Sequence, residues 1–205
     1  MSDSTAHAPA PVAPDVRPTA VLVVGVPAAG KSTVGRLLAE RLGTAAFIEG
    51  DVLWQMVVSG REDMAEPPSP GALAQLELRY RHGAMLARSF VDSGISAVHV
   101  DNIYGDAVTD QLARMGRRRA LVVLRPGVEA VVRRETERGT GAYAGWVGDG
   151  SLVDAVHTFD GWLAETPQVG LWIDSTDQAP DETVDAILAQ WDRALIDDPL
   201  ATRGA

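Results

Sequence analysis

The chain has 205 residues, of which 46% are hydrophobic and 22% are charged. This length and apolar content suffice for one compact domain with one substantial core. The formal net charge of -10 at pH 7 disfavours nucleic acid as a partner, because phosphate backbones are bound by clustered Lys and Arg. The absence of cysteine excludes disulfides, thiolate catalysis and cysteine-based metal sites, and it agrees with a cytoplasmic protein.

The two ends of the chain differ in composition from its middle. Residues 1–18 are rich in Ala, Pro, Ser and Asp and lack the basic start and apolar core of a secretory signal, so we expect a disordered tail. We expect residues 198–205 to be flexible, which leaves one domain over 19–197. No apolar run approaches the roughly 20 residues that cross a bilayer, so we expect no membrane partner.

Short apolar runs rich in β-branched residues alternate with segments long enough for helices. The run 19–24 is typical of a strand buried on both faces, and we predict that it is the central strand. Residues 32–42 carry apolar side chains at helical spacing and stop before a glycine. Five strands alternating with helices predict an α/β fold, a three-layer αβα sandwich around a five-stranded parallel sheet. The other four strands are predicted at 45–48, 95–100, 120–124 and 170–173.

Two connections have the character of substrate-side elements. Residues 52–93 form a long insertion with a proline-rich turn at 66–71 and a predicted helix over 72–91. The glycine-rich segment 139–150 is predicted to be a mobile loop. We assign it to a lid at about 134–151.

The segment GVPAAGKS at 25–32 matches the pattern G-x-x-x-x-G-K-[ST] in full, between a predicted strand and a predicted helix. In such a segment the backbone N–H groups and the helix dipole form an anion site for phosphates. A tight turn with a surface lysine is the alternative, which the flanking pattern disfavours. We therefore predict a site for ATP and Mg²⁺, with Lys31 on the β- and γ-phosphates and Ser32 on the metal. The predicted nucleotide-binding residues here are Gly25, Pro27, Ala28, Ala29, Gly30, Lys31, Ser32 and Thr33.

Two aspartates follow predicted strands and are therefore expected at the carboxyl edge of the sheet, beside the phosphate loop. Asp51 is the predicted catalytic base, and it would also contact the substrate. Asp101 ends an apolar strand and is predicted either to serve the metal or to contact the substrate. Either aspartate could instead cap the following helix. Glu49 is a weaker candidate, because strand alternation could turn it away.

Arginines are predicted on the helix that precedes the glycine-rich loop. Arg134 and Arg138 are four residues apart and so share one helix face. From beside a lid, guanidinium groups can stabilise charge on a phosphoryl group in transfer. We predict that both are catalytic and that Arg134 also contacts the nucleotide. The alternative is a solvated helix face.

Further candidates would surround the acceptor. Trp54 and Tyr104, each three residues after a candidate aspartate, could wall a substrate pocket or simply pack. Arg79 on the insertion helix could meet the substrate, although an exposed basic turn is the alternative. His99, without spaced partners, is predicted to be a core or sheet-edge histidine.

The stretches GVPAAGKSTVGRLL, IEGD, VHVDN and LVVLRPGVEAVVRRETERG together resemble P-loop phosphotransferases of the chloramphenicol phosphotransferase and tunicamycin-resistance type, neighbours of the gluconate and shikimate kinases. The resemblance spans roughly 19–190. It implies Asp51 as the base, phosphate and magnesium contacts at Lys31 and Ser32, and lid arginines near Arg134 and Arg138. It also implies a turn near Ser175 beside the adenine.

Three functions remain open from the sequence. The leading hypothesis is transfer of the ATP γ-phosphoryl group to a hydroxyl of a small molecule, such as an antibiotic or a biosynthetic intermediate of one. A second is an ATP-binding protein that sequesters a drug or acts as a switch. A third is a nucleotide or polynucleotide kinase, which the net charge of -10 disfavours. A homodimer should be tested before a monomer is assumed.

Overall fold

The computed structural model describes residues 17–146 and 150–196. The predicted flexible C-terminus and residues 1–16 of the predicted tail lie outside this part of the chain. The strands are β1 (Ala20–Val24), β2 (Ala45–Glu49), β3 (Ser96–Asp101), β4 (Arg119–Leu124), β5 (Leu171–Ile173) and β6 (Leu195–Ile196). The helices are α1 (Lys31–Arg41), α2 (Gly50–Gln55), α3 (Pro70–Asp92), α4 (Asp106–Arg114), α5 (Val128–Arg138), α6 (Leu152–Ala164), α7 (Pro180–Ala189) and α8 (Trp191–Ala194).

Five strands form a parallel sheet in the order β2-β3-β1-β4-β5, with β1 at the centre as predicted. All five residues of β1 are fully buried, which explains their continuous apolar run. In the β1–β3 register Val24 lies opposite Asp101. The residues that follow β1 and the end of β3 therefore share one edge of the sheet.

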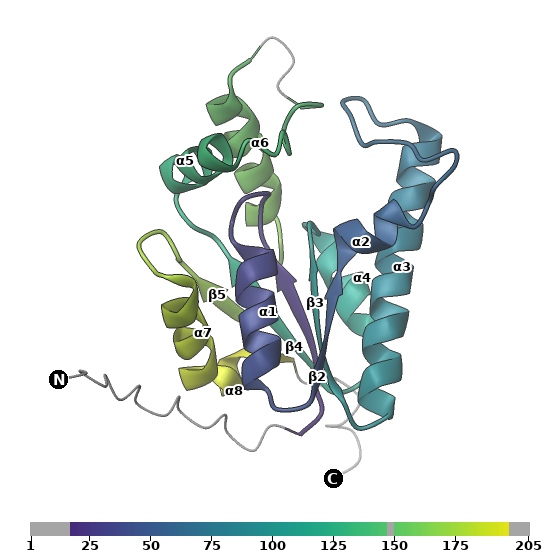
Figure 1. Ribbon diagram of the computed structural model, residues 1–205, viewed down its shortest axis with the longest axis vertical. Helices are drawn as coiled ribbons and strands as arrows, with labels where there is room; N and C mark the ends of the chain where they lie inside the picture. Colours follow the sequence, from purple (N-terminus) through teal and green to yellow (C-terminus); the bar gives the residue numbers. More distant parts are fainter. Residues whose placement is uncertain (1–16, 147–149, 197–205) are drawn as a thin grey trace, which may run out of the picture.

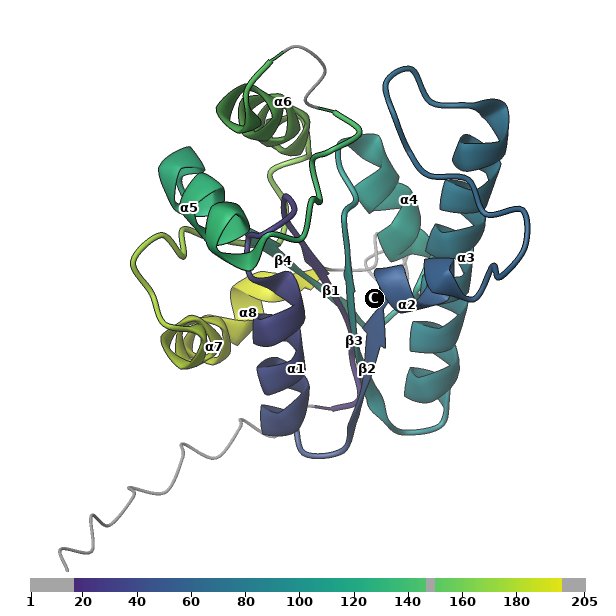
Figure 2. The same cartoon turned by 45° about the horizontal axis from the view of Figure 1, so that its top comes forward.

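Helices cover both faces of the sheet and stand above its carboxyl edge. Helices α1 and α7 contact each other on one face, and α3 and α4 contact each other on the opposite face (Figure 1). Helices α5 and α6 pack together above the carboxyl ends of the strands, across from the loop that joins α2 to α3 (Figure 2). The αβα prediction is confirmed. None of the helices in the described ranges is long and apolar enough to cross a bilayer.

Two local differences from the sequence prediction have simple causes. The two-residue strand β6, antiparallel to β4 at Arg119 and Ala120, was not predicted because it is too short to show a period. Helix α3 begins at Pro70 and not at residue 72, because the Ser69 hydroxyl accepts a hydrogen bond from the Ala72 amide at 3.0 Å and proline occupies the first turn.

We predict that Leu22→Ala destabilises the protein by about 3 kcal/mol, because Leu22 is fully buried between β3 and β4 and its removal leaves a cavity. Urea denaturation would measure the change in the free energy of unfolding. The control is Val58→Ala, since Val58 is 94% exposed, and it should change stability by less than about 0.5 kcal/mol. Equal losses from both variants would contradict the central position of β1.

Candidate active site

The phosphate-loop motif lies between β1 and α1, as predicted, and its backbone curls tightly. Ala28 and Gly30 both adopt left-handed conformations, with φ of 61° and 98°. A side chain at Gly25 would come within 2.5 Å of the Leu124 carbonyl oxygen, so the loop starts against the end of β4. A tight curl of this kind before the N-terminus of a helix is typical of an anion site.

Lys31 is the first residue of α1, and its side chain is buried beneath the loop. Its ammonium donates a hydrogen bond to the Val26 carbonyl at 2.8 Å. Burial lowers the pKa of Lys31 to about 8, against the opposing attraction of Asp51 and Asp101. No carboxylate in the described part of the chain forms an ion pair with Lys31, so its charge is available to an incoming phosphate.

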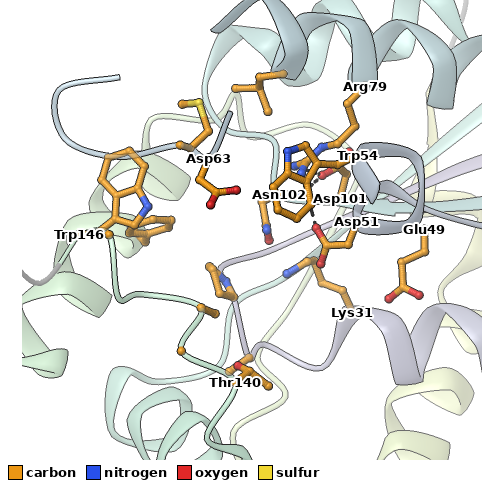
Figure 3. A pocket seen from close by; sticks show the side chains of 18 of the residues that line it. Lys31, Glu49, Asp51, Trp54, Asp63, Arg79, Asp101, Asn102, Thr140 and Trp146 are labelled. Atoms are coloured by element: carbon orange, nitrogen blue, oxygen red, sulfur yellow. Dashed lines mark hydrogen bonds and ion pairs between the residues drawn. The ribbon is translucent and has the colours of Figure 1, made fainter. Parts of the chain in front are cut away.

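A cavity of about 860 Å³ runs from the phosphate loop across the ends of β2 and β3 to the loop between α2 and α3 and to α6 (Figure 3). It gathers residues from distant parts of the sequence. Seven of the predicted acceptor-side or catalytic residues line it together with Glu49, the weaker candidate. The eight are Lys31, Glu49, Asp51, Trp54, Arg79, Asp101, Tyr104 and Arg138.

Arg79 joins the two predicted aspartates. Its guanidinium bonds to Oδ1 of Asp101 and lies 3.5 Å from Oδ1 of Asp51 (Figure 3). The Asp101 side chain is 1% exposed and that of Asp51 is 64% exposed. Arg79 is thus not part of an exposed basic turn: it connects a buried carboxylate to an accessible one.

Asp101 is ionised in spite of its burial. Burial disfavours its charge, but Arg79, His99 and the Asn102 amide outweigh that cost and hold the pKa of Asp101 below its usual value. Its Oδ1 also accepts from the Asn102 amide at 2.7 Å. Its Oδ2 lies 3.6 Å from Nε2 of His99, which is fully buried in β3, as predicted. The contacts of Asp101 are those of a residue that anchors Arg79, and its service to metal or substrate stays a prediction.

The glycine in the stretch IEGD has a steric reason that the sequence did not reveal. A side chain at Gly50 would come within 2.2 Å of Oδ2 of Asp101. Glycine therefore lets the start of α2 pack directly over the Asp101 carboxylate. This close approach brings Asp51, in the first turn of α2, to the mouth of the cavity.

Few side chains in the described ranges are placed to bind magnesium. In the ranges 17–146 and 150–196 no group of three or more His, Asp or Glu side chains is arranged to hold a metal ion. Mg²⁺ in phosphoryl-transfer sites keeps several waters and binds mainly to phosphates and one or two protein groups. Ser32, which lines the cavity at the start of α1, fits that kind of site.

A second pocket, of about 360 Å³, adjoins the outer side of the phosphate loop. Arg134 donates to the carbonyls of Ala29 at 3.4 Å and Ser175 at 2.8 Å, so it ties α5 to this pocket's two walls. Arg138 lines both cavities. The guanidinium of Arg134 is therefore bonded to backbone carbonyls. Arg138 is exposed, and its positive charge helps to lower the pKa of Lys31. The lining of the second pocket includes Ala28, Ala29, Gly30, Thr33, Arg134, Arg138 and Ser175.

The glycine-rich segment after α5 is attached to the protein through residues that the sequence analysis passed over. The buried Glu135 carboxylate accepts hydrogen bonds from the Thr140 hydroxyl at 2.8 Å and the Ala142 amide at 3.0 Å. Tyr143 is buried, and its hydroxyl donates to the Pro27 carbonyl at 2.9 Å. The first part of the predicted mobile loop is therefore pinned to the phosphate loop. No periodic signal marks these contacts, while residues 147–149 of the loop lie outside the described ranges.

We predict that Arg79→Met costs about 3 kcal/mol or more of stability, because it leaves the buried Asp101 carboxylate without its cation. The free energy of unfolding at neutral pH measures this loss. The matched control is Arg88→Met, which breaks an exposed pair with Asp92 on the same helix and should cost less than about 1 kcal/mol. A cost for Arg79→Met no larger than that of the control would contradict the buried pair.

The pH dependence of this loss has a definite sign. Because the pKa of Asp101 is lower in the folded chain, its stabilising contribution is present above about pH 4 and is lost as the pH falls further. Arg79→Met removes a cause of that lowered pKa. The destabilisation by Arg79→Met should therefore shrink in acid, which denaturation at two pH values would reveal.

No family model matches the chain, and no curated protein matches it. Solved structures do match. A sugar kinase from Janibacter sp. HTCC2649 superposes with a TM-score of 0.64 at 17% identity, over 86% of this chain and 96% of that chain. The tunicamycin resistance protein of Deinococcus radiodurans superposes with a TM-score of 0.61 at 16% identity, over 89% of this chain and 100% of that chain. The APS kinase of Mycobacterium tuberculosis, solved with AMPPNP and APS, superposes with a TM-score of 0.61 at 20% identity, over 86% of this chain and 98% of that chain. At such identities the likeness concerns the fold, and the fold of this chain is that of the P-loop kinases.

Proposed function

We propose that this chain transfers the γ-phosphoryl group of ATP to a hydroxyl group of a small molecule. The observation that carries the proposal is the shared cavity: Lys31 and Ser32 at the phosphate loop and the accessible carboxylate of Asp51 face the same space. A phosphate donor and a hydroxyl acceptor could occupy it together. In-line transfer needs both reactants held in one such site.

The proposed reaction assigns a task to each group. The acceptor oxygen forms a bond to the γ-phosphorus as the bond from that phosphorus to the β,γ-bridging oxygen breaks, which leaves ADP and a phosphate ester. Asp51 takes the hydroxyl proton. Arg79, 3.5 Å from the Asp51 carboxylate and anchored by Asp101, orients that base. Lys31 and the loop N–H groups stabilise the charge on the phosphate oxygens.

Magnesium and the arginines complete the proposal. When bound, Mg²⁺ supplies positive charge that neutralises the β- and γ-phosphate oxygens, and Ser32 is the residue to hold it. Arg138, exposed between the two cavities, is the arginine able to reach the transferring group. Arg134, with its bonds to loop carbonyls, keeps the nucleotide pocket in shape beside Ser175.

The acceptor is proposed to be an antibiotic or a natural-product intermediate. The similarity of fold to a tunicamycin resistance protein supports this class. Sugar and shikimate kinases are further neighbours by fold, so small hydroxylated metabolites belong in the same screen. The net charge of -10 speaks against a polynucleotide acceptor.

We predict that Asp51→Asn lowers phosphoryl transfer by about 100-fold or more and leaves Mg-ATP binding intact, because it removes the general base and keeps the side-chain shape. The measurement is mass spectrometry of hydroxyl-bearing antibiotics, sugars and nucleosides incubated with Mg-ATP, where a product gains the mass of one phosphoryl group. Asp110→Asn, an exposed carboxylate on α4, is the control and should keep full activity. ATP binding with no phosphorylated product from the wild-type protein would favour a sequestering or switch protein.

We also predict proton uptake when Mg-ADP binds near pH 8.5. Without nucleotide, Lys31 with a pKa of about 8 is largely neutral there, and phosphate anions raise that pKa, so binding protonates it. Affinity should therefore fall as the pH rises through about 8. Calorimetry in buffers of different ionisation enthalpy measures the uptake. Lys31→Arg keeps the cation without titrating, so an unchanged uptake in that variant would disprove the assignment.

A further inference from the structure

One part of the cavity has a wall of aromatic side chains. Trp146, Phe159 and Trp162 contact one another with ring centroids 4.7 to 5.3 Å apart, and Tyr104 meets Phe159 edge-on at 6.0 Å. All four line the cavity. These residues, called the aromatic wall below, come from the β3–α4 connection, the segment after α5 and helix α6. Such a wall binds an apolar ring or a cation over its faces.

The opposite side of this part of the cavity is the loop between α2 and α3. Gly145, next to Trp146, approaches this loop so closely that a side chain there would come within 3.2 Å of the Met64 carbonyl oxygen. Asp63 lines the cavity from this loop, and Figure 3 shows its carboxylate directed into the cavity. In the part of the chain that the structure describes, no hydrogen bond or ion pair involves Asp63.

The cations of the cavity are committed elsewhere. Arg79 is paired with Asp101 and Asp51. Lys31 bonds to the phosphate loop, and Arg138 lies between the two cavities at that same end. Arg61 stacks on the ring of Trp54 at 4.2 Å and does not line the cavity. Within 17–146 and 150–196, the part of the cavity beside the aromatic wall therefore offers a carboxylate, that of Asp63, which forms no ion pair.

Buried polar atoms in the same cavity also lack partners. In the described ranges, Oδ1 of Asn102, Oη of Tyr104 and Nε of Arg79 are buried and form no hydrogen bond, and all three residues line the cavity. Buried polar atoms cost free energy unless a ligand or water satisfies them. Oδ1 of Asn102 accepts hydrogen bonds and Oη of Tyr104 can accept them, so both can be satisfied by a donor group of a ligand.

We infer that the acceptor is a cationic amino alcohol with an apolar or aromatic portion, whose ammonium group lies between the Asp63 carboxylate and the aromatic wall. This inference rests on the proposed function and specifies its substrate class. An ammonium group offers three donors and a positive charge, which match the unpaired carboxylate and the aromatic faces. An anionic acceptor would find Arg79 already neutralised and would face Asp63.

The test uses three small probes that share one scaffold. The probes are 2-amino-1-phenylethanol, 1-phenylethane-1,2-diol and mandelate, which differ in carrying an ammonium, a hydroxyl or a carboxylate group. Binding to the full chain without nucleotide is followed at neutral pH by tryptophan fluorescence, since Trp54, Trp146 and Trp162 line the cavity. We expect the amine to bind about tenfold more tightly than the diol, and mandelate to bind most weakly.

Variants assign this preference to the site. Asp63→Asn should reduce the preference for the amine over the diol to less than about threefold, whereas Asp110→Asn, which makes the same charge change on the exposed face of α4, should leave it intact. Trp146→Leu should weaken both probes. The inference is overturned if the diol or mandelate binds as tightly as the amine, if the preference survives Asp63→Asn, or if no probe binds.

The outcome is separable from that for phosphoryl transfer. The probes are titrated without ATP, and Mg-ATP binding and transfer are measured independently. Selective amine binding in a protein that never forms a phosphorylated product supports the amine site and refutes the kinase. Phosphorylation of neutral or acidic acceptors, with no preference for the amine, supports the kinase and refutes the amine site.

Discussion

A carboxylate buried at the end of β3 constrains much of this site. Asp101 is 1% exposed at its side chain, and an ionised group in such a place needs a cation in direct contact. Arg79 supplies it from α3, 22 residues earlier in the chain, and so fixes that helix against the sheet. The same guanidinium reaches Asp51 on α2. One ion pair thereby couples the central sheet, the insertion and the proposed base.

This coupling also decides the charge of the acceptor side of the site. Arg79 is neutralised and Lys31 is turned toward the phosphate loop. The carboxylate of Asp63 and the aromatic wall therefore remain for the proposed acceptor. A site whose two ends differ in charge can bind an anionic phosphate donor at one end and a cationic acceptor at the other, so each reactant has its own place.

A second set of contacts joins the phosphate loop to the elements above it. Arg134 bonds to carbonyls on both sides of the second pocket, Glu135 holds the start of the glycine-rich segment, and Tyr143 bonds to Pro27. The bonds to Ala29 and Pro27 use backbone carbonyls of the loop, which are not needed as N–H donors to phosphate. The loop can therefore be supported from outside while its inward face stays available.

Sequence alone determined the features that local patterns encode. Buried strands show as apolar runs, α1 shows as a helical period, and the phosphate loop shows as spaced glycines before Lys31, because each depends on neighbours within a few residues. The placement of Asp51 and Asp101 at one sheet edge followed from parallel-strand geometry. Only the tertiary structure decided the rest: the pairing of Arg79 with Asp101, the reason for Gly50, the anchoring of Tyr143, and the presence of Asp63 and Trp146 in the lining of one cavity. These features join residues that are far apart in the chain. Long-range packing sets such contacts, so no periodic pattern in the sequence reveals them.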